Sequence, residues 1–275
     1  MHPPRRIDAP ERAHLGDRDG YTAPVHRFAP APALADLVRR YWMPVWSLPE
    51  GSTTVQRVLQ YPVCQLVVAP SYALLVGPAR GLSTRELTGS GWALGAMLQP
   101  AAGALLLDGP VSALTDRTVP LDDLAHVDGP AIARRVRAAV GDAPDDATRQ
   151  QAAVLVLEET LSALPPADEE GLLVNAVVEH VENDPTVERV GQVCEKFALS
   201  ERSLQRLTAR RIGLSPKWLI QRRRLHEAAG LLAAGDAPDL ATVAARLGYS
   251  DQAHFTRDFR TVTGLTPGEY AREPR

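Results

Sequence analysis

An internal repeat in the last third of the chain limits its fold more than any other feature. Residues 193–200 align with residues 243–250 at an offset of 50, and after one extra residue 213–216 align with 264–267. Each copy reads as a short helix, a tight turn, a second helix opened by a serine, and a glycine that ends it. This order predicts a helix-turn-helix unit that occurs twice.

The ends of the expected helices carry residues suited to those positions. Ser200 and Ser250 are predicted N-caps, because a serine hydroxyl accepts a bond from the first turn and an acid follows each one. Glycine fits the position after a helix end, and proline fits a first turn. These residues are Gly213, Gly264, Pro216 and Pro267.

The apolar residues of each copy predict two small cores, and one long helix would join them. The first core is expected from Val190, Val193, Phe197, Leu199, Leu204, Leu207 and Ile212. The second is expected from Leu240, Val243, Leu247, Tyr249, Phe255, Phe259 and Val262. A helix over residues 215–234 would be about 30 Å long at 1.5 Å per residue. It could hold the two second helices about one DNA turn, roughly 34 Å, apart, so that both enter the major groove on one face of the duplex.

Charge and proline divide the chain at one place. Residues 1–185 carry a net charge of −8, whereas residues 186–275 carry +5. Nineteen of the 23 prolines lie in the first segment. A basic segment favours a polyanionic partner such as DNA, although a solvated basic helix face would have the same composition.

The first segment reads as a β-rich domain followed by helices. Strands are expected over residues 40–48, 53–61, 63–68, 72–76 and 92–98, with turn residues between them, which is typical of a sandwich or barrel. Helical stripes follow at 131–140 and 152–164, and these could dimerise or pack back on the barrel. The predicted class is α+β, with a tail over 1–20, a sensor or dimerisation domain over 21–165, a linker over 166–170 and an all-α domain over 171–275.

The last hundred residues, 171–273, strongly resemble the DNA-binding domain of the AraC/XylS family. The resemblance is concentrated in residues 244–259, followed by 264–267 and Tyr270, and the first copy matches through 199–207 and Gly213. It departs at Thr208, where such domains usually have an aromatic residue. The N-terminal half looks like the sensor-type domain of some actinobacterial-style regulators, through residues 41–42, 56–59, 77–78 and 98–100.

The resemblance implies which side chains contact DNA. Base-reading positions would be Arg202, Ser203, Gln205, Arg206, Gln252, Ala253, Thr256 and Arg257. Arginine can bind guanine bidentately and glutamine can bind adenine, so we expect Arg206 and Arg257, which are equivalent in the two copies, to discriminate most. A surface ion pair, for example Arg257 with Asp258, is the alternative. Phosphate contacts would come from Arg210, Arg211, Lys217, Arg222, Arg223, Arg224 and His254.

The first segment is expected to bind a small-molecule effector, and its aromatic residues are the candidates. Tyr41, Trp42, Trp46 and Trp92 could line an apolar pocket or simply form the barrel core. No catalytic or metal-binding motif is visible, so we expect no cofactor and no enzyme. Cys64 and Cys194 read as buried packing residues.

The expected function is a sequence-specific transcriptional regulator in the cytoplasm. Its partners would be double-stranded DNA, a small-molecule effector, a second copy in a homodimer and, for an activator, RNA polymerase, with no membrane contact. Two alternatives stay open: a barrel enzyme fused to a DNA-binding module, and a ligand-independent DNA-binding protein whose first domain only dimerises.

Overall fold

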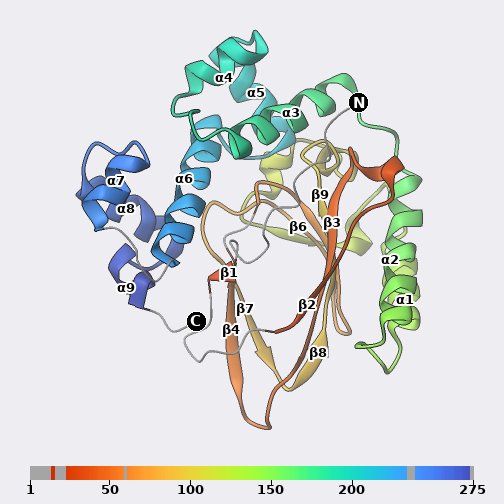
Figure 1. Ribbon diagram of the computed structural model, residues 1–275. Helices are drawn as coiled ribbons and strands as arrows, with labels where there is room; N and C mark the ends of the chain where they lie inside the picture. The colour runs from red at the N-terminus through yellow and green to blue at the C-terminus, as the bar shows by residue number, and fades with distance from the viewer. Residues whose placement is uncertain (1–13, 16–22, 59–60, 234–238, 273–275) are drawn as a thin grey trace.

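The computed structural model describes residues 14–15, 23–58, 61–233 and 239–272 (Figure 1). A β-rich domain with two covering helices is followed by a purely helical domain, so the predicted α+β class is confirmed. The tail expected over residues 1–20 lies outside the described residues, except for the short strand β1 (His14–Leu15). No described helix is both long and apolar enough to cross a membrane.

Two antiparallel sheets form the β-rich domain. The smaller has the order β1–β4 (Thr53–Val58)–β7 (Ser83–Thr88). The larger sheet has the strand order β10 (Thr118–Pro120), β6 (Ala73–Val76), β5 (Gln65–Val68), β9 (Leu94–Leu98), β3 (Val38–Ser47) and β2 (Val25–Phe28). Outside this order, β8 (Ser90–Trp92) also pairs with β3. All five expected strand segments are present. The strands β1, β2, β7 and β10 and the first two residues of β8 were not predicted, because these strands are short or largely exposed and so carry little hydrophobic alternation.

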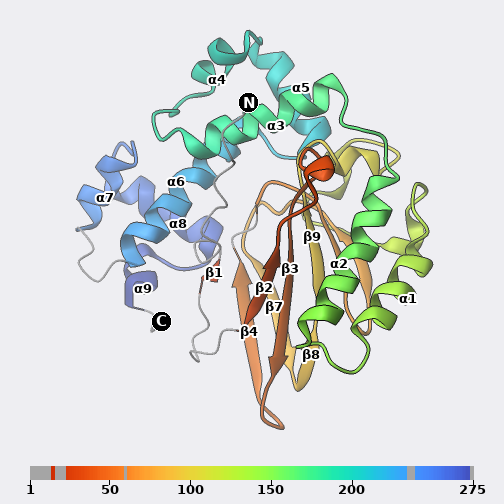
Figure 2. The ribbon, with the colours of Figure 1, turned by 45° about the vertical axis from the view of Figure 1, so that its right-hand side comes forward.

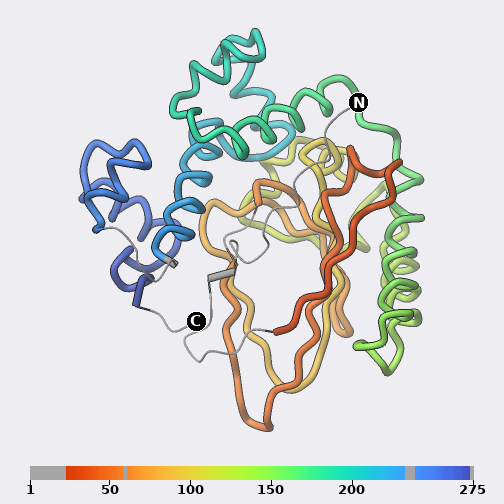
Figure 3. Tube along the Cα trace, in the orientation of Figure 1, coloured from red at the N-terminus to blue at the C-terminus, as the bar shows by residue number. Residues whose placement is uncertain are grey.

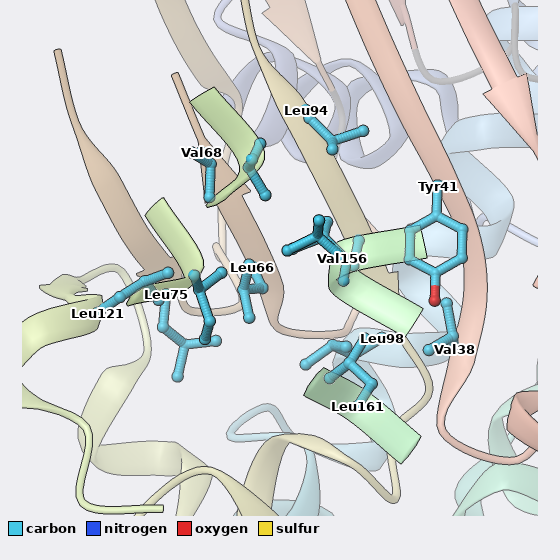
Figure 4. Close-up of a cluster of buried hydrophobic side chains, with 14 of the residues drawn as sticks. Val38, Tyr41, Leu66, Val68, Leu75, Leu94, Leu98, Leu121, Val156 and Leu161 are labelled. Atoms are coloured by element: carbon cyan, nitrogen blue, oxygen red, sulfur yellow. The ribbon is translucent and has the colours of Figure 1, made fainter. Parts of the chain in front are cut away.

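One face of the larger sheet forms the main core of the protein. On β3, Tyr41, Met43 and Val45 point into this core, because every second side chain of a strand lies on the same face. Helices α1 (Gly129–Val140) and α2 (Ala147–Ser162) cover the same face, as Figure 2 shows from the side. Val156 and Leu161 of α2 lie among the strand side chains in Figure 4. The two predicted apolar stripes therefore pack on the sheet.

The helical domain begins inside the expected linker. Asp168 caps α3 (Glu169–Asn183) by accepting a bond from Gly171 N at 2.7 Å. Then follow α4 (Val190–Phe197), α5 (Glu201–Arg211), α6 (Pro216–Ala233), α7 (Leu240–Arg246), α8 (Gln252–Thr263) and α9 (Pro267–Arg272). Figure 3 shows α6 as the connection between the α4–α5 pair and the α7–α8 pair.

The helix ends agree with the sequence at all but one position. Ser200 caps α5 by accepting a bond from Ser203 N at 3.1 Å, and Gly213 and Gly264 have φ of 79° and 74°. Ser250 is not the cap of α8, which corrects the prediction. Asp251 is the cap and accepts from His254 N at 2.7 Å, so α8 begins one residue later than the sequence predicted.

Each helix-turn-helix unit has its own core, and α6 contributes to both. Every residue expected in the two cores lies in them. The sequence missed the contribution of α3, whose Val174, Val177 and Val181 pack into the first core. Thr208 is fully buried, and its hydroxyl donates to Gln205 O at 3.2 Å.

The two helix-turn-helix turns differ at one equivalent residue. Gly248 has φ of 72° at the turn after α7, and Ala198, its counterpart in the repeat, has φ of 53° after α4. Both residues are therefore in the left-handed region, which favours glycine because it has no Cβ. The first unit therefore has an alanine at a position where the second unit has a glycine, which adopts this conformation with less strain.

We expect Ala198→Gly to raise the free energy of unfolding by about 0.5–1 kcal/mol, because it relieves the left-handed alanine. Gly248→Ala should lower that free energy by about 1 kcal/mol. Urea unfolding of the full chain followed by circular dichroism measures both. A destabilised Ala198→Gly would show that the alanine is not strained in the folded protein.

Candidate nucleic-acid interface and effector cavity

The second helix of each unit, α5 and α8, presents the predicted base-reading side chains at the surface. We call these two the recognition helices. Six of the eight predicted positions are exposed, and Ser203 and Thr256 are half-buried. All eight lie in the first two turns of their helices. The described structure therefore leaves both faces open to a partner of suitable shape.

Arg206 and Arg257 occupy equivalent positions on the recognition helices and are both exposed. Within the described part of the chain, neither guanidinium has a hydrogen bond or an ion pair. The expected alternative for Arg257 was a pair with Asp258, but Asp258 lies beside His254, with Oδ2 and Nε2 3.7 Å apart.

On α8 the recognition face extends further than the sequence analysis proposed. Gln252, Ala253, Thr256 and Arg257 line a shallow hollow together with Arg260 and Thr266. Arg260 follows Ala253 and Thr256 by seven and four residues, so it lies on the same helix face. Helical periodicity alone could have identified this arginine.

Three of the predicted phosphate contacts are wrong, because their side chains are buried and paired inside the protein. Arg211 is 7% exposed and pairs with Asp168 at 2.5 Å and Glu170 at 3.2 Å. Arg223 donates to Val187 O at 2.8 Å and pairs with Glu227 at 3.2 Å, and burial lowers its pKa. Arg222 is 4% exposed and pairs with Glu182 at 3.5 Å. The sequence could not separate these arginines from the surface ones, since most of their partners are distant in the chain. Glu170 and Glu182 belong to α3, Asp168 is its cap, and only Glu227 of α6 is local.

The other predicted phosphate contacts reach the surface. Lys217 and His254 are exposed. Arg210 is exposed and forms an ion pair with Glu170. Arg224 is half-buried and donates to Glu188 O at 3.1 Å.

A cavity of about 330 Å³ lies between the two sheets of the β-rich domain. Its wall includes the β3 residues Arg40, Trp42, Pro44 and Trp46, with further residues from β2 and from the strands of both sheets. From Arg40 onward these cavity side chains have even numbers, whereas the core residues Tyr41, Met43 and Val45 have odd numbers. Val38, which lies before a register shift between residues 38 and 40, also belongs to the core. The strand therefore separates the core from the cavity.

Two of the four predicted pocket residues are misplaced for this reason. Tyr41 is fully buried in the core on the α1–α2 side (Figure 4), where burial raises its pKa. Trp92 of β8 lies in the same core. Trp42 and Trp46 do line the cavity. Because Tyr41 and Trp42 are adjacent in one strand, their side chains must point to opposite faces.

Tyr61, which follows β4, joins this cavity to the helical domain. Its side chain lines the cavity, and its ring is also covered by guanidinium groups from two domains. The distances from the ring centroid to the guanidinium carbons are 4.4 Å for Arg222 of α6, 4.5 Å for Arg39 and 5.1 Å for Arg40. The ring of His226 in α6 lies 5.9 Å away. No local sequence signal marks Tyr61, because its partners are far away in the chain.

Hydrogen bonds tie the two domains together around this contact. Glu182 of α3 pairs with Arg39 at 2.5 Å as well as with Arg222. Asn175 of α3 accepts from Ala101 N at 2.9 Å and donates to Asp36 O at 3.0 Å.

A second set of bonds lies at the ends of α5 and α6. The hydroxyl of Thr115 donates to Gly213 O at 2.8 Å, and a Cβ on Gly213 would lie 2.5 Å from that hydroxyl oxygen. Trp218 Nε1 donates to Arg80 O at 3.1 Å. Gly213 is thus required both by its positive φ and by the close approach of Thr115.

The cysteines are packing residues, as expected from the sequence. Cys64 is 2% exposed, and burial raises the pKa of its thiol to about 12. Burial is also the main cause that raises the pKa of Cys194. Among the described residues, no group of three or more His, Cys, Asp or Glu side chains is placed to hold a metal ion.

Comparison with known families finds two matches on separate parts of the chain. Residues 193–273 match the family described as a helix-turn-helix domain. Residues 26–120 match a domain of unknown function, DUF6597.

Among curated proteins, the chain is similar to an uncharacterized HTH-type transcriptional regulator of Haemophilus influenzae, with 32% identity over 95 residues, or 34% of this chain and 30% of the relative. It is also similar to the HTH-type transcriptional activator RhaS of Escherichia coli, with 37% identity over 75 residues, or 27% of each chain. The chain thus spans less than a third of the length of either relative.

Two solved structures are reported among those similar to this chain. A probable AraC family transcriptional regulator from Rhodopseudomonas palustris shares 29% identity over 38% of this chain and 98% of its own, with a TM-score of 0.35. An apo variant of ToxT from Vibrio cholerae shares 13% identity over 85% of this chain and 97% of its own, with a TM-score of 0.41. The family match falls on the duplicated helical region, and residues 193–273 of the chain are a helix-turn-helix domain.

Proposed function

We propose that this protein is a transcriptional regulator that reads DNA sequence with α5 and α8 and responds to a small molecule bound in its β-rich domain. The observation that carries the DNA part is the repeated pair of exposed arginines, Arg206 and Arg257, at equivalent positions of two linked units. A guanidinium at the surface of a recognition helix can bind guanine O6 and N7 with two parallel bonds.

The length of α6 supports reading of two successive turns of the major groove. Its 18 residues span about 27 Å at 1.5 Å per residue. Such a spacer is compatible with two recognition helices about one DNA turn, roughly 34 Å, apart. Lys217 at the start of α6, Arg210 and His254 are the proposed phosphate contacts. A homodimer and a contact with RNA polymerase stay predictions from the family resemblance.

The effector part rests on the position of Tyr61. This residue is part of the cavity wall and of the contact with α6, so a ligand that moves its ring also changes the support of the helix between the two units. Such a shared residue provides the differential contact that a ligand needs to shift a conformational equilibrium.

Arg206→Ala and Arg257→Ala should each relax the preference at one base position by roughly 1–3 kcal/mol. Lys217→Ala should instead weaken binding to every sequence alike and reduce the salt slope by about 0.9. The measurement is binding to a duplex selected from a random pool and to an unselected duplex, at several salt concentrations.

Arg134→Ala is the matched control for these variants, because Arg134 is an exposed arginine of α1, far from both recognition helices, and the charge change is the same. It should leave both affinities unchanged. Equal losses on the selected and unselected duplexes for both recognition-helix arginines would overturn their assignment as base readers.

Tyr61→Leu should increase hydrogen exchange in α6, since the guanidinium of Arg222 loses the aromatic ring that it covers. The exchange rates are measured by mass spectrometry on peptides from residues 216–233. Each cation–ring contact contributes about 0.5–2 kcal/mol, so we expect several-fold faster exchange there.

Tyr72→Leu is the control for this variant. It also removes a cavity tyrosine under an arginine, because Arg85 lies 4.3 Å above the Tyr72 ring, but that pair is within the β-rich domain. Exchange in α6 should be the same as in the wild type. Unchanged α6 exchange in Tyr61→Leu would show that Tyr61 does not couple the cavity to this helix.

A further inference from the structure

The floor of the cavity is made by two tryptophans that lie over glycines of neighbouring strands. A Cβ on Gly95 would come within 2.2 Å of the Trp42 ring, and a Cβ on Gly91 within 2.5 Å of the Trp46 ring. Trp42 Nε1 donates to Gln65 Oε1 at 2.9 Å, and Trp46 Nε1 donates to Thr88 O at 3.3 Å. The glycines let both indole rings lie close to the sheet, which leaves space above an aromatic surface.

The register of the larger sheet places polar groups at one end of this space. Arg40 lies opposite Met97 of β9, and Met97 lies opposite Gln65 of β5. All three residues line the cavity, and so does Tyr61, whose ring is next to the guanidinium of Arg40. Trp46 lies six residues further along β3, so the polar and aromatic ends of the cavity are separated along the strand.

The described wall has a one-sided charge. It contains three arginines, Arg27, Arg40 and Arg85, and no carboxylate. The nearby Glu182 is shared by Arg39 and Arg222 at the domain contact. Stacking on Tyr61 and Tyr72 orients the guanidinium groups of Arg40 and Arg85, and a planar guanidinium offers paired N–H donors to a carboxylate.

From these contacts we propose that the cavity binds a compact apolar monoanion, a proposal that rests on the sensor role proposed above. The carboxylate lies at Arg40 and Gln65, next to Tyr61, and the ring or alkyl chain of the ligand lies on Trp42 and Trp46. The volume of about 330 Å³ is at the lower end of the roughly 300–1,000 Å³ of small-molecule sites, which suits a single ring or a medium-length chain.

Other ligand classes fit this wall less well. A cation would meet the three arginines of the cavity wall, and none of the described lining residues is a carboxylate that could compensate for its lost hydration. A polyhydroxylated ligand would bury hydroxyl groups against Val67, Leu74, Val76 and the two indole rings, where they lack partners.

The test measures affinities of the full-length protein for matched ligands by calorimetry. The panel consists of phenylalkanoates and linear alkanoates of increasing length, each with its neutral amide and its amine. We expect at least one acid to bind about tenfold or more tightly than its amide, and the amines not to bind. Amides or amines that bind as tightly as the acids, or a panel in which no acid binds at millimolar concentration, would overturn the proposal.

Variants of the cavity arginine locate the anionic group. Arg40→Gln should reduce the ratio of acid to amide affinity to about one, whereas Arg40→Lys should keep part of it. Arg134→Gln, which removes an exposed arginine of α1, should leave the ratio unchanged. If Arg40→Gln does not fold, Arg85→Gln at the exposed side of the cavity is expected to lower the same ratio, and an unchanged ratio there would count against the anion site.

The same preparations separate the ligand class from the sensor role. Affinity for a duplex selected from a random pool is measured with and without the bound acid. Acid-selective binding without any change in DNA affinity would support the ligand class and contradict the sensor role. If the protein binds DNA but shows no preference for acids, the proposed regulator function stands and the proposed ligand class is overturned.

Discussion

The ring of Tyr61 is the contact on which the arrangement of the two domains depends. Three guanidinium groups cover it, two from β3 and one from α6, and Glu182 of α3 bridges two of these cations. Cations over an aromatic face gain most where water is excluded, and Tyr61 is only 6% exposed. Because the same ring forms part of the cavity wall, the supports of α6 and the contents of the cavity are not independent.

Strand β3 contributes side chains to two parts of the β-rich domain, the core and the cavity, just as α6 contributes side chains to both cores of the helical domain. After the register shift between Val38 and Arg40, odd-numbered residues of β3 build the core under α1 and α2, and even-numbered residues build the cavity wall. Glycines on the neighbouring strands then decide how the tryptophans of the cavity side lie. In the helical domain, α6 contributes to the cores of both helix-turn-helix units, so a change in its position affects both recognition helices.

Much of the helical domain could be predicted because its signals are local. Helix caps, terminating glycines and apolar periodicity involve residues within about one turn of each other. Because the unit occurs twice, each structural position could also be compared between the two copies. The one misplaced cap, Ser250, was off by a single residue, since Asp251 offers an equivalent acceptor. Of the four residues predicted to line the pocket, Trp42 and Trp46 face the cavity, while Tyr41 and Trp92 lie in the core. The error for Tyr41 could have been avoided from the sequence, because Tyr41 and Trp42 are adjacent in one strand and their side chains must point to opposite faces.

The sequence by itself determined the two units, their cores, their exposed recognition faces and the division between a β-rich and a helical domain. Only the tertiary structure decided which arginines remain at the surface. Arg211, Arg222 and Arg223 are buried and pair mainly with carboxylates and carbonyls in α3 or next to it. Most of these partners lie 36 or more residues away in the chain. The tertiary structure also decided that Tyr61 joins the cavity to α6. Local periodicity specifies which face of a helix or strand is apolar, whereas the partner that covers a charged side chain comes from a distant part of the chain.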